Sequence, residues 1–307
     1  MIEADELTKT YGRRKAVDRL TFRIHPGRVT GFLGPNGAGK STTIRLILGL
    51  DQPSGGRVRI DGRPYRALER PLRQIGALLD ATAVHGGRRA RDHLRWLAQT
   101  NDISAGRVTE VLRITGLADA AHRRVGGFSL GMKQRLGIAA ALLGDPGILI
   151  FDEPVNGLDP DGVHWIRGLL RSLAGEGRTV LISSHLISEL QLTADHVLIL
   201  GRGRLLSDSS MADLVHHAGG GDVLVRTAAE TPLAALFTAR GASVTTEPRH
   251  GLAVAGLTPG DVAAIAAAHS IPLLELTPRP PSLEDVFRRI TDPGLQYRSG
   301  PHREDAR

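Results

Sequence analysis

The sequence contains no cysteine. This absence excludes disulfides and metal sites built from thiolates, and it is typical of a chain in a reducing compartment. No run of about 18 apolar residues occurs, so we expect no membrane-spanning helix. The first residues, "MIEADELTKTYG", carry acids where a secretory signal needs a basic start and an apolar stretch. We therefore expect a cytoplasmic protein.

Aromatic residues and lysines are also scarce. Aromatic residues make up 4% of the chain, and only four of its 39 basic Lys and Arg residues are lysine. The arginines that carry the net charge of +7 are scattered, and few aromatic side chains are available to stack on bases. A solvated basic surface explains this pattern better than a nucleic-acid interface. We predict no nucleic-acid partner.

The chain has 307 residues, of which 41% are hydrophobic and 23% charged. These values are typical of a folded protein, and the length suffices for one large domain and a smaller one. The most informative stretch is "GPNGAGKSTT", residues 34–43. An apolar run of strand length, "RVTGFLG", precedes it, and "KSTTIRLILGL" follows it with apolar residues at helical spacing. Strand, glycine loop and helix are the context that the phosphate-binding loop Gly-x-x-x-x-Gly-Lys-Ser/Thr requires.

Each part of this loop has a physical role in holding a triphosphate. Gly37 and Gly39 allow backbone N–H groups to curl around an anion, and the helix that follows directs its positive end to the same place. Lys40 would reach the β- and γ-phosphates, and the Ser41 hydroxyl would bind Mg²⁺. The residues predicted to bind ATP here are Gly34, Pro35, Asn36, Gly37, Ala38, Gly39, Lys40, Ser41 and Thr42.

Two further strands are predicted to bring polar groups to the phosphates. The apolar run in "GILIFDEP" (147–154) ends on Asp152 and Glu153, and "TVLISSH" (179–185) ends on His185. Ligands of open α/β sheets lie at the carboxyl ends of the strands. We assign Asp152 to the Mg²⁺ shell, Glu153 to the attacking water as general base, and His185 to the γ-phosphate. A structural role for His185 is the alternative.

A capped helix lies between these strands in "FSLGMKQRLGIAAALLGDP" (128–146). Ser129 is predicted to cap its N-terminus, and Gly144 and Pro146 end it. In this order, the loop, the capped helix, "ILIFDEP", "NGLDP" (156–160) and His185 closely resemble the nucleotide-binding subunit of an ABC transporter, over about residues 1–210. The resemblance implies an α/β P-loop NTPase core with an inserted helical subdomain at about 85–143.

The resemblance also implies roles that the residues alone do not. Tyr11 matches the aromatic residue that stacks on adenine. The segment 128–132, "FSLGM", matches the family's signature motif, in which Ser129 and Gly131 are kept and contact the γ-phosphate bound to the other subunit. Asp159 matches the aspartate of a loop that crosses the dimer interface. A homodimer is therefore implied.

Three positions depart from the family pattern. Leu130 and Met132 replace glycine and glutamine of the signature motif, while the Ser129 hydroxyl and the helix N-terminus remain to bind an anion. Asp80, after "IGALL", stands where the family has a glutamine near Mg²⁺. We assign Asp80 to the metal shell; the alternative is that it only caps the turn before Ala81.

A small second domain is predicted after the ATPase domain (1–215) and a linker (216–222, "HHAGGGD"). It extends over 223–291 with the order β-α-β-β-α-β, the ferredoxin-like split unit, and forms an α+β fold. The predicted elements are strand 223–227, helix 231–240, strands 242–247 and 251–256, helix 259–269, strand 272–277 and a final helix 282–291 capped by Ser282. We interpret the domain as dimer-stabilising or regulatory, with ligand sensing as the alternative, and expect disorder in 292–307.

The leading hypothesis is the ATPase subunit of an exporter, peripheral on the cytoplasmic face of the membrane beneath a separately encoded integral-membrane permease. The tail resembles that of drug-efflux and peptide-antibiotic-immunity subunits, so we expect export of such compounds. An importer ATPase stays open as an alternative. A soluble ABC ATPase acting on ribosomes usually joins two cassettes, and a second P-loop is absent. A DNA-repair ATPase would need a long coiled coil where only residues 42–128 lie.

Overall fold

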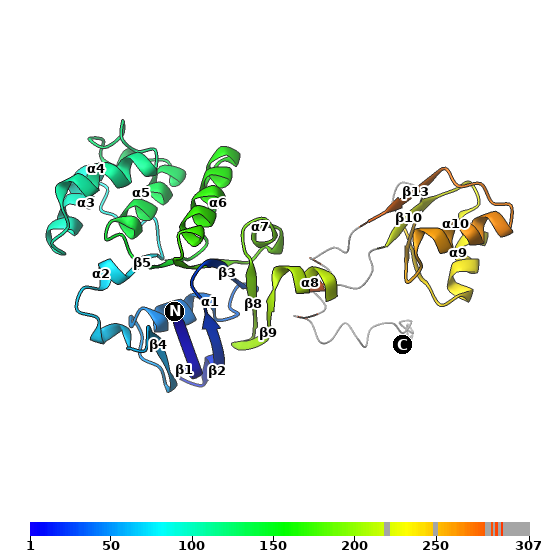
Figure 1. Ribbon diagram of the computed structural model, residues 1–307, viewed down its shortest axis with the longest axis horizontal. Coiled ribbons are helices and arrows are strands. Elements are labelled where there is room, and N and C mark those ends of the chain that lie inside the picture. Colours follow the sequence, from blue (N-terminus) through cyan, green and yellow to red (C-terminus); the bar gives the residue numbers. More distant parts are fainter. Residues whose placement is uncertain (218–221, 248–250, 280–283, 285, 288–289, 291–307) are drawn as a thin grey trace, which may run out of the picture. The chain divides into compact units, whose positions relative to one another are not determined.

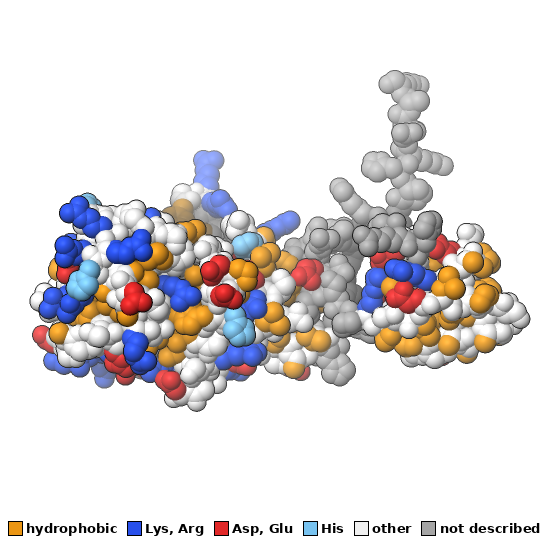
Figure 2. All heavy atoms as spheres, turned by 90° about the horizontal axis from the view of Figure 1, so that it is seen from above, with side chains coloured by type: hydrophobic (Ala, Val, Ile, Leu, Met, Phe, Trp, Pro, Cys, Tyr) orange, Lys and Arg blue, Asp and Glu red, His pale blue; other side chains and the backbone are white. Residues whose placement is uncertain are grey.

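The computed structural model describes residues 1–217, 222–247, 251–279, 284, 286–287 and 290. The chain divides into two compact units, Met1–Met211 and Ala212–Arg307. Within the described ranges, no helix combines the length and apolar character that crossing a bilayer requires. On the face drawn in Figure 2, the basic side chains of the first unit are scattered and have acidic ones among them.

A six-stranded sheet forms the centre of the first unit, with the strand order β5-β6-β7-β3-β8-β9 (Figure 1). All neighbours in it are parallel except β8 and β9. β3, β6 and β7 are almost entirely buried, as expected for strands covered on both faces. They confirm the three strands predicted from the sequence. The bounds are β3 (Arg28–Leu33), β5 (Ile75–Leu78), β6 (Ile148–Phe151), β7 (Thr179–Ser184), β8 (His196–Gly201) and β9 (Arg204–Ser210).

A second, antiparallel sheet packs against this centre. Its order is β2-β1-β4, with β1 (Ile2–Tyr11), β2 (Arg14–Ile24) and β4 (Gly55–Ile60). Apolar side chains of these strands share one core with those of α1 (Lys40–Ile47) and with the large sheet. The helix that follows the glycine loop is thus held between two sheets, which fixes the position of its N-terminus.

The remaining helices of the first unit form two groups. α3 (Ala90–Gln99), α4 (Ala105–Ile114) and α5 (Leu130–Leu142) pack on one another within the predicted helical region, and Figure 1 shows them together beside β5. α6 (Pro160–Gly175) and α7 (Ile187–Gln191) pack on β3 and β7. Short helical turns complete this unit at 65–67, in α2 (Pro71–Gln74) and at 125–127.

The second unit contains a four-stranded antiparallel sheet with the order β11-β12-β10-β13. Its elements are β10 (Val223–Arg226), α9 (Glu230–Ala239), β11 (Ser243–Thr246), β12 (Leu252–Ala255), α10 (Pro259–Ala268) and β13 (Glu275–Pro278). This order is that of the ferredoxin-like split unit. Side chains of α9 and α10 form one core with those of the sheet, and Figure 1 shows both helices against it.

The last strand begins later than the sequence predicted. β13 starts at Glu275, whereas we expected a strand from 272. Pro272 has no N–H to donate, and its carbonyl oxygen accepts a hydrogen bond from the Thr227 hydroxyl at 2.8 Å. α8 (Met211–His217) begins at the last residue of the first unit. Most of the predicted linker, most of the predicted helix over 282–291 with its cap Ser282, and all of 292–307 lie outside the described residues.

Candidate active site

The phosphate-binding loop has the backbone that its glycines predict. Gly37 and Gly39 have φ of 81° and 107°, a region that side-chain-bearing residues avoid. A Cβ atom on Gly39 would lie 2.6 Å from the Ala16 carbonyl oxygen, and one on Gly34 would lie 2.5 Å from that of Leu200. Gly39 is also the N-cap residue of α1 and offers no side-chain cap. The first-turn N–H groups of α1 therefore remain available to an anion.

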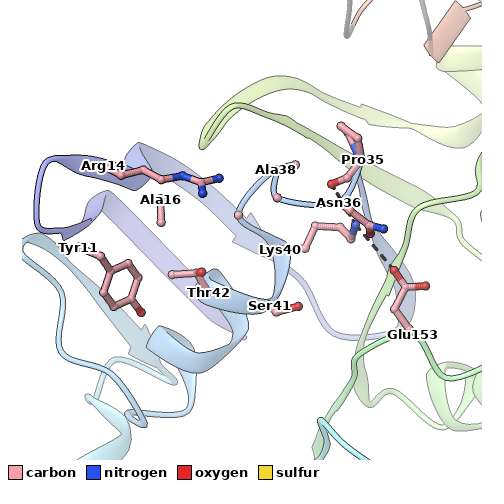
Figure 3. Close-up of a pocket in the computed structure, with 12 residues that line it drawn as sticks. Tyr11, Arg14, Ala16, Pro35, Asn36, Ala38, Lys40, Ser41, Thr42 and Glu153 are labelled. Atoms are coloured by element: carbon pink, nitrogen blue, oxygen red, sulfur yellow. Dashed lines mark hydrogen bonds and ion pairs between the residues drawn. The ribbon is translucent and has the colours of Figure 1, made fainter.

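These residues border a cleft of about 430 Å³ (Figure 3). Figure 3 shows Tyr11 at one end, Glu153 at the other, and Thr42, Ser41 and Lys40 between them. The complete lining is Tyr11, Arg14, Ala16, Pro35, Asn36, Gly37, Ala38, Gly39, Lys40, Ser41, Thr42 and Glu153. The backbone cradle and the length of the cleft fit a nucleoside triphosphate, with the phosphates at the loop and the base toward Tyr11.

Lys40 is the buried cation of the cleft. Its Nζ donates to the Gly34 carbonyl at 2.5 Å and lies 3.7 Å from Glu153 Oε1. Burial lowers the pKa of this ammonium, and the nearby carboxylates of Glu153 and Asp152 oppose that shift. A buried ammonium with few anionic partners gains from a phosphate placed beside it.

Tyr11 forms the opposite end of the cleft on a surface turn. Its ring is 48% exposed, and Lys9 Nζ lies 4.9 Å from the ring centre. The Tyr11 hydroxyl donates to Asp51 Oδ2 at 2.9 Å, and this hydrogen bond is the main reason that the Tyr11 pKa is raised. The tyrosine is thus neutral and oriented, with an open ring face on which a base could stack.

Arg14 and Ala16 also line the cleft, although the sequence analysis did not select them. Arg14 is the cross-strand partner of Tyr11, one residue past the turn that joins β1 to β2. A hairpin prediction for "KTYGRRKAV" would have placed Arg14 beside Tyr11. That pairing was the signal available in the sequence.

The two acids after β6 are held differently. The Ser183 hydroxyl, on β7, donates to Asp152 Oδ1 and accepts from the Glu153 N–H at 2.9 Å. The Glu153 carboxylate lies within 3.0 Å of His185 Nδ1 and 3.7 Å of Lys40 Nζ. The structure therefore brings together Glu153, His185 and Lys40, the three residues predicted to be catalytic. Sequence reasoning missed Ser183.

The residues of the signature segment 128–132 do not line the cleft. The Ser129 hydroxyl accepts from the Met132 N–H at 3.2 Å and caps α5, which confirms the predicted cap. Asp159 caps α6 in the same way, since its Oδ1 accepts from the Gly162 N–H at 2.8 Å. The structure thus places Ser129, Gly131 and Asp159 at helix N-termini. None of them lines the cleft of its own chain.

The departure at Leu130 is accommodated by a glycine of the loop 156–160. A Cβ atom on Gly157 would overlap the Leu130 side chain, and Gly157 has φ of 76°. Leu130 is still 48% exposed. A Cβ atom on Gly131 would lie 3.0 Å from the Gly157 carbonyl oxygen, so the two segments are in contact. The larger residue in the signature segment is therefore paired with a position that has room for it.

Asp80 follows β5 and is exposed. Its Oδ1 accepts from the N–H and the hydroxyl of Thr82, both at 2.7 Å. These hydrogen bonds lower the pKa of the Asp80 carboxyl. Among the described residues, no group of three or more His, Asp or Glu side chains is placed to hold a metal ion. Asp80 thus closes a turn, and its place in a metal shell stays a prediction.

Comparisons with known proteins agree with this geometry. The family model "ABC transporter" matches residues 17–156, and a model of a domain of unknown function matches 221–284. The chain is 45% identical over 211 residues to the bacitracin transport ATP-binding protein BcrA of Bacillus licheniformis, covering 68% of this chain and 69% of that one. It is 36% identical over 206 residues to the lantibiotic transport ATP-binding protein SrtF of Streptococcus pyogenes, covering 67% and 89%.

A solved structure adds a likeness of fold. A dimeric ATP-binding cassette in a post-hydrolysis state, bound to ADP and Pi, has a TM-score of 0.63 and 26% identity to this chain. The match covers 69% of this chain and 99% of that one. Together with the phosphate-binding loop and Glu153 in one cleft, and His185 beside Glu153, these similarities identify the family. The chain belongs to the ABC transporter family, as an ATP-binding and ATP-hydrolysing subunit.

Proposed function

We propose that this subunit works as a homodimer beneath a separate integral-membrane permease, on the cytoplasmic face of the membrane, and powers the export of a peptide antibiotic. The names of the relatives, bacitracin transport and lantibiotic transport ATP-binding proteins, support the substrate class. The observation that carries the hydrolytic step is the contact of Glu153 with both His185 and Lys40 beside the phosphate-binding loop.

We assign binding of the triphosphate to the backbone of 34–42 and to Lys40 Nζ, which lies buried beside the loop. Tyr11 would stack on adenine at the other end. The Ser41 hydroxyl and the carboxylates of Asp152 and Asp80 are the proposed ligands of Mg²⁺, directly or through water. When bound, the metal would neutralise charge on the phosphate oxygens. Oδ2 of Asp80 forms no hydrogen bond in the described structure, so this oxygen remains available.

Hydrolysis needs a base for the attacking water, and Glu153 is the proposed group. Its carboxylate would take the proton as the water oxygen bonds to the γ-phosphorus and the bond to the β–γ bridging oxygen breaks. His185 Nδ1, 3.0 Å from Glu153 Oε2, would hold this carboxylate while the ring's other nitrogen faces the γ-phosphate. The proton of the water thus goes to Glu153, and ADP leaves with the bridging oxygen.

The homodimer is supported by the position of the remaining site residues. Ser129, Gly131 and Asp159 are ordered outside the lining of their own cleft, and a similar cassette is dimeric. A second copy facing the first would bring its α5 N-terminus to the γ-phosphate. For the unit after residue 211, we propose dimer stabilisation or regulation, because among its described residues no cluster of potential metal ligands occurs.

The test is Glu153→Gln in the purified chain. Loss of a general base should lower ATP turnover by about 10²-fold or more while ATP binding is kept. Gel filtration with ATP should then show a stable dimer, because closure occurs and reopening does not. Glu176→Gln, at an exposed glutamate paired with Arg178, is the matched control and should turn over normally. Normal turnover in Glu153→Gln would refute the assignment.

Export is tested in cells that express the chain together with its candidate permease. Susceptibility to bacitracin and to a lantibiotic should fall, and Glu153→Gln should abolish this protection because ATP is no longer consumed productively. Protection that is equal with the wild-type chain and with Glu153→Gln would contradict export driven by this subunit.

A further inference from the structure

The backbone of Glu153 adopts a conformation that a glutamate avoids. Its φ is 49°, in the left-handed region where a Cβ atom crowds the neighbouring carbonyl. Non-glycine residues persist in this region where their surroundings hold them there. The residues that hold the Glu153 backbone therefore also determine where its carboxylate points.

The N–H of Glu153 is held by Ser183. The Ser183 hydroxyl is 1% exposed and lies on β7, the strand beside β6. It accepts from the Glu153 N–H at 2.9 Å and gives its own hydrogen to Asp152 Oδ1. The single hydrogen of this hydroxyl goes to Asp152, and its oxygen accepts from Glu153. One side chain therefore fixes both acids.

The carbonyl side of Glu153 is held by Gln134. Gln134 is 5% exposed and lies on α5. Its Nε2 donates to the carbonyl oxygens of Pro154 at 3.0 Å and of Glu153 at 3.3 Å. Both partners are acceptors, so only the NH₂ group of the amide fits between them. Within the turn, the Asn156 N–H also donates to the Glu153 oxygen at 3.2 Å.

We propose that Gln134 and Ser183 are positioning residues for ATP hydrolysis, which aim the Glu153 carboxylate by holding its backbone from both sides. The inference rests on the proposed role of Glu153 as the base. With the backbone held, the carboxylate lies 3.0 Å from His185 and 3.7 Å from Lys40. Without the Gln134 amide, the Pro154 oxygen loses its side-chain donor and the turn can relax toward an ordinary φ.

The experiment compares two substitutions with their controls. Gln134→Met keeps the length of the side chain and removes the donor; Gln99→Met, at an exposed glutamine of α3, controls for the substitution itself. Ser183→Ala removes the hydroxyl, and Ser183→Thr keeps it. We expect Gln134→Met and Ser183→Ala to lower kcat by about 10- to 100-fold, the effect of displacing a catalytic group by about 1 Å. ATP affinity should stay within about twofold. Gln99→Met should turn over as the wild type does, and Ser183→Thr, which keeps the hydroxyl, should lose less activity than Ser183→Ala.

A double-variant cycle separates positioning from a general structural role. In the Glu153→Gln background, adding Gln134→Met should lower the residual single-turnover rate by less than about twofold, because the group being aimed is already missing. The proposal would be overturned if both Gln134→Met and Ser183→Ala kept the wild-type kcat. It would also be overturned if Gln134→Met lowered the rate by the same factor with and without Glu153. If instead Glu153→Gln itself turns over normally, the proposed base is wrong, a result distinguishable from failure of the positioning.

Discussion

Two regions of the first unit hold the residues that we assign to the nucleotide site, and they differ in how complete they are within one chain. The first is the cleft between Tyr11 and Glu153, where loop, cation, acid and histidine already contact one another. The second comprises the N-termini of α5 and α6, where Ser129 and Asp159 are ordered by capping and do not line that cleft.

The difference follows from what each region is attached to. The phosphate end of the cleft lies at the ends of adjacent parallel strands, β3, β6 and β7, so sheet formation brings its residues together, while Tyr11, Arg14 and Ala16 come from the β1–β2 hairpin. The α5 N-terminus and the loop before α6 contact each other through Leu130 and Gly157, and neither segment lines the cleft. A region that is preformed yet has no ligand in its own chain is what a site shared between two copies requires.

The largest effect is expected from a test that breaks the two regions separately. Lys40→Ala removes the cation of the cleft, and Ser129→Asp places a negative charge at the α5 terminus while keeping a good cap. Each variant alone should lose ATP turnover by about 10²-fold, as when a charge-stabilising group is removed. Mixed before ATP is added, the two should recover about a quarter of wild-type turnover, because half of the dimers then hold one intact shared site.

Ser129→Asn is the control for the second variant, since it caps α5 without the added charge and should keep most of the activity. A mixture that stays as inactive as its components would contradict sharing of the site between two chains.

The sequence predicted the cleft far better than its supports. Residues 34–42, Asp152, Glu153 and His185 follow a local rule in which loop chemistry and strand ends determine position. Ser183 and Gln134 follow no such rule, because a serine in a strand and a glutamine in a helix are ordinary residues. Their roles depend on which strand lies beside β6 and on which helix face reaches residue 153, and both are tertiary facts.

A similar division runs through the fold. Three of the parallel strands, β3, β6 and β7, and the β-α-β-β-α-β order of the second unit were predicted from apolar runs and breakers. The antiparallel sheet β2-β1-β4 was not predicted, because β4, "GGRVRI", is largely exposed and shows little apolar signal. Leu130 departs from the family's signature motif. Its fit against Gly157 appears only when two loops from different helices meet.

An intermediate effect is expected at the adenine end of the cleft. Tyr11→Ala should weaken ATP binding by about 10-fold, because base–aromatic stacking contributes about 1–3 kcal/mol. Tyr11→Phe keeps the ring and loses only the hydroxyl bond to Asp51, so its affinity should stay within about twofold of the wild type. Tripolyphosphate, which has no base, should bind Tyr11→Ala normally and Lys40→Ala weakly, in a fluorescence competition assay. Equal loss of both ligands in Tyr11→Ala would indicate a distorted loop instead.

The smallest effect concerns Asp80, which follows β5, the strand beside β6, and has two candidate roles. Its Oδ1 is occupied by Thr82, which is enough for a turn cap, while its charge and Oδ2 would serve a metal. Asp80→Asn retains an acceptor for Thr82 and removes the charge; Thr82→Val removes one hydrogen bond and leaves the charge.

If Asp80 is in the metal shell, nucleotide binding by Asp80→Asn should depend on Mg²⁺ a few-fold less steeply, because bare carboxylates repel the triphosphate until the metal arrives. Thr82→Val should instead lower the free energy of unfolding by about 1 kcal/mol with an unchanged Mg²⁺ titration. Titrations of ATP affinity against Mg²⁺ that superimpose for the wild type and Asp80→Asn would leave Asp80 as a turn cap alone, and the cleft would then hold its metal with Ser41 and Asp152.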